Sequence, residues 1–211
     1  MVGPSSSHTA GACRLGYVVQ AILGGMPDRA VVGLHGSFAM TGEGHGTRTA
    51  ITGGLLGHRP DDERLREAEA EAAEKGIEVE FHTVDLGSDA HPNSAVFEVA
   101  RGGERIAITG CSIGGGRIRV QEIDGFAVDL SGSLPAIVVV ADDVPGTVAR
   151  ITGLIAERGL NVATVRVDRT GRGERALMTI ETDEDVPDGV LAELAGQSWV
   201  HWIRNVHQLN A

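Results

Sequence analysis

Hydrophobic positions in the first 130 residues recur with either a helical or a strand spacing. Leu15, Val18, Val19 and Ile22 are three or four residues apart or adjacent, which predicts a helix over residues 15–23 that ends at a glycine pair. Short apolar runs bounded by glycine and polar residues predict strands. The predicted helices are 15–23, 48–56 and 60–76, and the predicted strands are 30–36, 77–84, 95–100, 104–109, 117–120 and 125–130. This part of the chain is therefore expected to be an α/β domain.

The remaining residues give a second pattern that is complete in itself. The predicted elements, in order, are strand 136–141, helix 147–158, strands 160–168 and 175–182, helix 187–195 and strand 200–209. The order βαββαβ is that of a ferredoxin-like sandwich, in which two helices cover one face of an antiparallel sheet. Because the other face needs cover as well, we expect self-association. The sequence thus predicts an α+β protein with domains over 1–132 and 133–211, joined at Ser131-Gly132-Ser133.

The composition limits the kinds of partner that the protein can have. The chain has 18 Lys and Arg against 29 Asp and Glu, a formal charge of −11, which argues against nucleic acid or an anionic membrane as the main partner. It has no signal-peptide pattern and no long uncharged apolar run, so we expect a cytoplasmic protein. Its two cysteines, Cys13 and Cys111, are too few for the four thiolates of a typical iron–sulfur cluster, and we expect buried thiols.

Hydroxyl groups and an imidazole crowd together just before the first predicted helix. Ser5, Ser6, Ser7 and Thr9 surround His8 there. Ser and Thr are preferred at helix N-caps, and the free N–H groups of a helix N-terminus bind carboxylates and phosphates. His8 would be placed there to move a proton near neutral pH. The simpler interpretation is a serine-rich N-cap without a ligand.

Three later loops carry further candidates. His45 lies between glycines that let a backbone approach a ligand closely, and Thr47 is expected to cap the next helix. The proline after His91 holds it extended, and Asn93 offers both a donor and an acceptor. The triple glycine 114–116, between two predicted strands, indicates either a tight bend or a set of N–H groups for an anion. An exposed loop at His45 and a plain turn at Asn93 are the simpler alternatives.

Four stretches stand in order along the chain: Gly3-Pro4-Ser5-Ser6-Ser7-His8-Thr9, Gly44-His45-Gly46-Thr47, His91-Pro92-Asn93 and Ser112-Ile113-Gly114-Gly115-Gly116. In sequence and in order they resemble the β chain of the iron–sulfur-dependent L-serine dehydratases. The second domain resembles an ACT domain, whose marks here are Asp143-Val144-Pro145-Gly146 and Gly159-Leu160-Asn161-Val162. Members of the dehydratase family usually carry a further segment before the first motif, so the natural start is expected to lie upstream of Met1.

The resemblance implies a lyase subunit that converts L-serine to pyruvate and ammonia together with an α chain. A [4Fe–4S] cluster would be held by that partner α chain, and one of its irons would act as a Lewis acid on the departing hydroxyl group. No metal ligand is assigned to the present chain. The catalytic candidates that the resemblance implies are His8, His45, His91 and Asn93, which would face the α chain's active site. The candidates for binding the substrate carboxylate are Ser5, Ser6, Ser7 and Thr9.

Other functions stay open on the sequence alone. The first domain also resembles the allosteric substrate-binding domain of some phosphoglycerate dehydrogenases, in which case the chain would be a serine-sensing regulatory module without catalytic residues. A metal site built from three histidines is disfavoured, because their spacing lacks any short-range ligand pair. In the ACT domain, Pro145, Gly146 and Asn161 are candidates for binding an amino-acid effector, and a role in assembly alone is the alternative.

Overall fold

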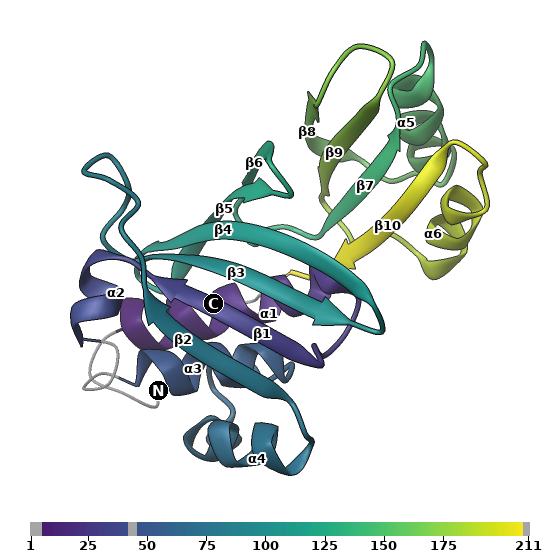
Figure 1. The fold of residues 1–211 in the computed structure, drawn as a ribbon. Helices are drawn as coiled ribbons and strands as arrows, with labels where there is room; N and C mark the ends of the chain where they lie inside the picture. Colours follow the sequence, from purple (N-terminus) through teal and green to yellow (C-terminus); the bar gives the residue numbers. More distant parts are fainter. Residues whose placement is uncertain (1–5, 42–45, 209–211) are drawn as a thin grey trace. The chain divides into compact units, whose positions relative to one another are not determined.

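The computed structural model describes residues 6–41 and 46–208, and the chain separates into two compact units between Asp124 and Gly125 (Figure 1). A mixed sheet with the strand order β2-β1-β3-β4-β5-β6 organises the first part of the chain. β1 runs parallel to β2, whereas the pairs β1–β3, β3–β4 and β4–β5 are antiparallel. The strands are β1 Arg29–Leu34, β2 Glu78–Thr83, β3 Ser94–Arg101, β4 Glu104–Gly114, β5 Arg117–Ile123 and β6 Phe126–Leu130.

Helices cover one face of this sheet (Figure 1). α1 packs against β3, β4 and β5 and against α3. The strand residues on this face, among them Ala30, Val32 and Phe97, are fully buried, whereas their neighbours Arg29 and Glu98 are exposed. The alternation predicted from the sequence therefore separates a covered face from an open one. The helical segments are η1 Ser7–Gly11 (π), α1 Ala12–Leu23, α2 Gly36–Thr41, α3 Thr47–Leu55, η2 Glu63–Glu67 (3₁₀) and α4 Ala68–Glu74.

Glycines let α1 and α3 cross with their backbones in contact. A Cβ atom on Gly54 would lie 2.1 Å from the Cys13 carbonyl oxygen, and one on Gly16 would lie 2.4 Å from the Ile51 carbonyl oxygen. Both distances are far below any van der Waals contact, and both obstacles are backbone atoms that cannot turn away. The close crossing explains why this unit can have a tight core with few aromatic side chains.

One predicted helix is divided in the structure, and one short helix was not predicted. Residues 60–76 form η2 and α4 rather than one helix, because the chain bends at Glu67, whose φ and ψ are −109° and 10°. The bend lets Leu65 pack over Gly53, where a Cβ atom would lie 2.2 Å from the leucine Cδ2. The short helix α2 was not predicted, and it forms around Phe38, whose side chain is fully buried.

The second unit has the predicted ferredoxin-like fold, which is confirmed. Its antiparallel sheet has the order β10-β7-β9-β8. The core between the sheet and the two helices is aliphatic, with Ile137, Val139, Ile180, Ile151 and Leu194 at its centre. The elements are β7 Ala136–Asp142, α5 Thr147–Glu157, β8 Val162–Arg169, β9 Arg175–Thr182, α6 Asp188–Ala195 and β10 Val200–Val206.

The other face of this second sheet is not open. Val138 and Val140, which point away from the helices, are 0% and 4% exposed. Within the same unit, β6 contacts β8 and β9, and the backbone N–H of Ala127 donates to Asp168 Oδ2 over 2.7 Å. Exposed valines lie instead on the edge strand β8, where Val165 and Val167 are 41% and 43% exposed, and around the start of α5, where Val144 and Val148 are each 43% exposed. No helix in the described part of the chain is long and apolar enough to cross a membrane.

Candidate active site

The first motif does not form the N-cap that its hydroxyls predict. The helix begins earlier as the π-helix η1, and Ser6 before it already has helical φ and ψ of −61° and −32°, with no capping bond from its side chain. The Gly11 N–H donates to the Ser6 carbonyl over 3.0 Å, which is the five-residue spacing of a π-turn. The extra residue in this turn widens the helix at the motif. Such insertions occur frequently at functional sites.

η1 places the first-motif side chains in different surroundings. His8 is half-buried, its Nδ1 is 3.3 Å from Ser7 Oγ, and its Nε2 is 3.1 Å from Ser37 Oγ in α2. The imidazole also lies edge-on to the Phe38 ring, with 5.3 Å between the centroids. Thr9 is 2% exposed, and its Oγ1 has no hydrogen-bond partner among the described residues. The candidate Ser5 lies outside the described residues.

The third motif is held in a defined geometry. The Asn93 N–H donates to His91 Nδ1 over 3.1 Å, so Nδ1 is the acceptor of this bond and Nε2 is the ring's remaining donor. Asn93 is in turn held on β4, because its carbonyl accepts the Ser112 N–H at 3.0 Å and its Nδ2 lies 3.5 Å from the Ser112 carbonyl. The side-chain Oδ1 of Asn93 is buried without a partner among the described residues.

Segments from four parts of the chain meet at one end of the sheet. α2 contacts both histidine segments, since Ser37 lies against His8 and the Phe38 N–H donates to the Pro92 carbonyl over 3.3 Å. η1 contacts β4 directly, because a Cβ atom on Gly11 would lie 2.0 Å from Ser112 Oγ. η1 therefore contacts α2, α2 contacts loop 91–93, loop 91–93 contacts β4, and β4 contacts η1. We call these four segments the motif cluster.

The triple glycine forms the tight bend, one of its two predicted alternatives. Gly114, Gly115 and Gly116 have φ values of 95°, 61° and 74°, which side-chain-bearing residues rarely adopt. Arg14 on α1 donates from Nη1 to the Gly116 carbonyl over 2.8 Å. This bond holds the bend beside the motif cluster.

Ser112 is a site residue that the sequence reasoning missed. It is fully buried, and its Oγ has no hydrogen-bond partner among the described residues, like Thr9 Oγ1 and Asn93 Oδ1. Buried polar atoms nearly always have a partner in native proteins, so three such atoms in one cluster are unusual. Its position in the fourth motif, two residues before the triple glycine, was the available signal.

The predictions for the second motif have mixed outcomes. His45 lies outside the described residues. The prediction that Thr47 caps α3 is wrong: the cap is Gly46, with a φ of 70°, and Thr47 is fully buried with its Oγ1 unpartnered among the described residues. The left-handed conformation of Gly46 suits a glycine. Thr47 is already the first residue of the helix, so its hydroxyl is not at the cap position.

Neither cysteine offers a thiolate. Burial raises the pKa of Cys13 to about 12, and burial raises that of Cys111 as well. Both thiols are free and buried. Across residues 6–41 and 46–208, no group of three His, Cys, Asp or Glu side chains is placed to hold a metal ion. The residues of this chain therefore do not fit an iron–sulfur cluster of its own, since a [4Fe–4S] cluster takes thiolate ligands.

The effector candidates of the second unit lie at exposed turns. Gly146 caps α5 with a φ of 92°, next to the exposed Pro145. Asp143 in the same turn accepts from Arg169 Nη1 and from the Gly173 N–H at 3.1 and 3.0 Å, and these bonds lower the pKa of its carboxyl. Asn161 Nδ2 donates to Asp183 Oδ2 over 2.7 Å. A ligand at Asn161 would thus compete with that carboxylate.

Comparison with known proteins decides the family. Residues 1–123 match the family model described as "Serine dehydratase beta chain", and residues 136–197 match the ACT domain model. The chain belongs to the serine dehydratase β-chain family. It is 45% identical to the "Probable L-serine dehydratase, beta chain" of Bacillus subtilis over 92% of this chain and 88% of that protein. The resemblance drawn from the four motifs is confirmed.

More distant relatives share parts of the family's sequence. The "L-serine dehydratase, beta chain" of Peptoniphilus asaccharolyticus is 34% identical over 93% of this chain and 89% of its own length. A "D-3-phosphoglycerate dehydrogenase" of Synechocystis is 28% identical over 85% of this chain but only 32% of its own length. The second relative agrees with the likeness to phosphoglycerate dehydrogenases that the sequence indicated.

Proposed function

We propose that this chain is the β subunit of an L-serine dehydratase and that the motif cluster forms its part of the active site. Conversion of L-serine to pyruvate and ammonia requires loss of the α-proton and of the hydroxyl group, followed by hydrolysis of the resulting imine. A base, a proton donor and a site for the carboxylate are therefore needed. The observation that carries the proposal is the convergence of His8, His91, Asn93 and Ser112 through α2 and β4.

His8 is the proposed proton carrier. Both of its ring nitrogens lie near serine hydroxyls, Ser7 Oγ and Ser37 Oγ. A hydroxyl rotates to donate or to accept, so it accommodates the neutral and the protonated ring equally. Histidine is the side chain whose ordinary pKa suits proton transfer near neutral pH, and on this ground we assign that role to His8.

His91 is proposed to orient the substrate rather than to carry a proton. The Asn93 N–H points at its Nδ1, and the imidazolium form, which has a proton on both nitrogens, would face that N–H with a second donor. With Nδ1 accepting this bond, Nε2 is the ring nitrogen left to donate. That N–H is available to donate to a substrate oxygen.

The unpartnered polar atoms supply the proposed contacts with the substrate. Thr9 Oγ1 and Ser112 Oγ are hydroxyls that can donate to the serine carboxylate, and Asn93 Oδ1 can accept from the ammonium group. Ser6 and Ser7, which are half-buried on the same segment, are further candidates. A bound substrate would satisfy the atoms that the protein leaves without partners.

The cluster that completes the reaction is proposed to belong to the α chain. A [4Fe–4S] cluster held there would act as a Lewis acid on the substrate hydroxyl group. The two buried, protonated cysteines of the present chain agree with this division. The ACT unit is proposed to assemble the enzyme through the exposed edge of β8, where Val165 and Val167 would pack against a second copy.

Anaerobic reconstitution with the α chain tests the proposal, with pyruvate formation as the readout. His8→Ala should lower kcat by at least about 100-fold, as expected for loss of a group that transfers a proton. His82→Ala is the matched control, because this exposed histidine lies on β2, outside the four motifs. If His8→Ala and His91→Ala change only the dependence on serine concentration and leave kcat intact, the chain is a sensor and the proposal fails.

A further inference from the structure

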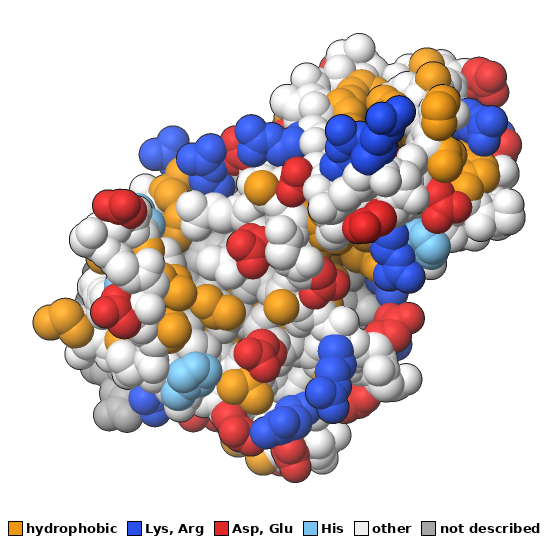
Figure 2. Space-filling view, turned by 45° about the horizontal axis from the view of Figure 1, so that its top comes forward, with side chains coloured by type: hydrophobic (Ala, Val, Ile, Leu, Met, Phe, Trp, Pro, Cys, Tyr) orange, Lys and Arg blue, Asp and Glu red, His pale blue; other side chains and the backbone are white. Residues whose placement is uncertain are grey.

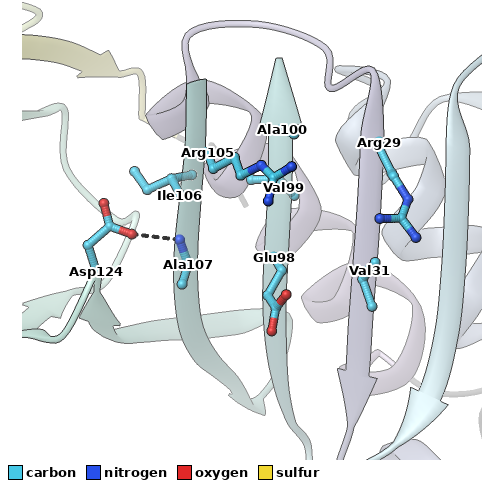
Figure 3. A pocket seen from close by; sticks show the side chains of 9 residues that line it. All are labelled: Arg29, Val31, Glu98, Val99, Ala100, Arg105, Ile106, Ala107 and Asp124. Atoms are coloured by element: carbon cyan, nitrogen blue, oxygen red, sulfur yellow. Dashed lines mark hydrogen bonds between the residues drawn. The ribbon is translucent and has the colours of Figure 1, made fainter. Parts of the chain in front are cut away.

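The open face of the first sheet has a cavity that the proposed active site does not use. Its volume is about 270 Å³, and it is lined by residues of β1, β3 and β4 and by Asp124 after β5 (Figure 3). None of its lining residues belongs to the four motifs. The cavity lies entirely within the first unit, on the sheet face that α1 and α3 leave uncovered.

Strand register builds the cavity floor in two rows. In the first row Arg29 on β1 pairs with Ala100 on β3, which pairs with Arg105 on β4. The second row is Val31, Glu98 and Ala107 in the same strand order. It lies two residues later on β1 and β4, and two residues earlier on the antiparallel β3. Two guanidinium groups therefore flank a small alanine, and one carboxylate stands between two small apolar residues.

The cavity's charges are balanced but not paired with one another. Arg29 is held from outside the cavity by Glu80 and Glu78 at 2.7 and 3.4 Å. Asp124 Oδ1 accepts the Ala107 N–H at 2.7 Å. Arg105 and Glu98 have no ion pair within 4 Å among the described residues, although Glu98 adds, after Glu80 and Glu78, to the negative charges that raise the pKa of Arg29. Figure 3 shows the Arg105 guanidinium over β3 and the Glu98 carboxylate nearer the start of that strand.

We propose that this cavity binds a small zwitterionic α-amino acid, with its carboxylate on Arg105 and its ammonium group on Glu98. The two rows are about 7 Å apart, because a strand rises about 3.3 Å per residue. An α-amino acid with a charge-assisted hydrogen bond of about 2.8 Å at each end spans a distance of this order. The alanines below Arg105 and beside Glu98 leave room for its carbon atoms.

The equal numbers of positive and negative side chains favour a zwitterionic amino acid over an anion as the ligand. Two arginines and two carboxylates line the cavity, so a ligand without net charge suits it better than a phosphate or a dicarboxylate. Acidic and basic side chains both occur on the face that Figure 2 shows. A volume near the lower limit for small-molecule sites favours an amino acid with a short side chain. L-Serine is the natural first probe.

Residue-resolved NMR of the full chain without its partner tests the site. Titration with L-serine should shift the amide signals of Val31, Ala100 and Ala107, which distinguishes this cavity from the motif cluster and from the ACT unit. Arg105→Gln and Glu98→Gln should each weaken these shifts at least about tenfold, as loss of a charge-assisted hydrogen bond implies. Arg66→Gln and Glu74→Gln are matched controls at exposed positions outside the cavity and should leave them unchanged.

Ligands that lack one charge complete the test. 3-Hydroxypropionate has no ammonium group and ethanolamine has no carboxylate, and both should bind at least about tenfold more weakly than L-serine. Equal binding of either analogue, or cavity shifts that persist in both variants, would overturn the assignment. Because the readout is binding and not turnover, its failure leaves the proposed dehydratase function untouched, and loss of turnover on His8→Ala leaves this site untouched.

Discussion

Gly11→Ala tests the contact that closes the motif cluster. Gly11 has helical φ and ψ of −66° and −40°, so alanine there should by itself stabilise the helix by about 1 kcal/mol. Against this, the new Cβ would lie 2.0 Å from Ser112 Oγ and 2.8 Å from Ser112 Cβ. Overpacking of a buried position costs about 1–3 kcal/mol, and two contacts this short place the cost near the upper end. We expect a net loss of about 2 kcal/mol in the free energy of unfolding.

Urea unfolding followed by circular dichroism measures this loss. Gly153→Ala in α5 is the control, because it is also a helical glycine but has no neighbouring atom within 4 Å of the added Cβ, and it should be stabilised by about 1 kcal/mol. Adding Ser112→Gly to Gly11→Ala removes both obstructing atoms. Because the two substitutions are coupled, the double variant should recover at least about 1 kcal/mol of the unfolding free energy that Gly11→Ala loses. Stabilisation of Gly11→Ala equal to that of the control would refute the packing of η1 on β4.

Three further predictions concern the first unit. Gly54→Ala should lower the free energy of unfolding, measured in urea, by at least about 3 kcal/mol. Its Cβ would lie 2.1 Å from the Cys13 carbonyl oxygen, a backbone atom that cannot turn away. His58→Gln should lose about 1–3 kcal/mol, because the buried His58 Nε2 is 2.7 Å from Glu71 Oε2. That contact lowers the pKa of Glu71, so it adds to the free energy of unfolding above pH 4.5 and this addition is lost as the pH falls further. The free energy of unfolding of His58→Gln should therefore depend less on pH below 4.5 than that of the unchanged protein. Cys13 should react with a thiol reagent at about pH 8 only in urea, because burial raises its pKa to about 12, and reaction in the folded protein would contradict the described core.

Local signals in the sequence were sufficient for most of the regular elements. The glycine pair after β3 predicts the β3–β4 hairpin, and the spacing of Ile151 and Ile155 predicts α5, because both depend on residues close together in the chain. The short helix α2 could not be found in this way. It is held by contacts of Phe38 with His8 and with the Pro92 carbonyl, which come from distant segments. Local propensity does not report such contacts.

The meeting of the motifs follows from strand direction, which explains why the candidate site was partly predictable. β1 and β4 both run antiparallel to β3, so the C-terminal ends of β1 and β4 lie beside the N-terminal end of β3. α2 follows the first of these ends, loop 91–93 precedes β3, and Ser112 with the glycine bend closes β4. The predicted hairpin alone therefore places loop 91–93 beside Ser112. What no sequence pattern supplies is the position of η1, since Gly11 meets Ser112 only because α1 crosses the sheet on its covered face. Substrate contacts proposed for Thr9 and His8 depend on that crossing, and this is why the packing of Gly11 against Ser112 is the sharpest place to test the site.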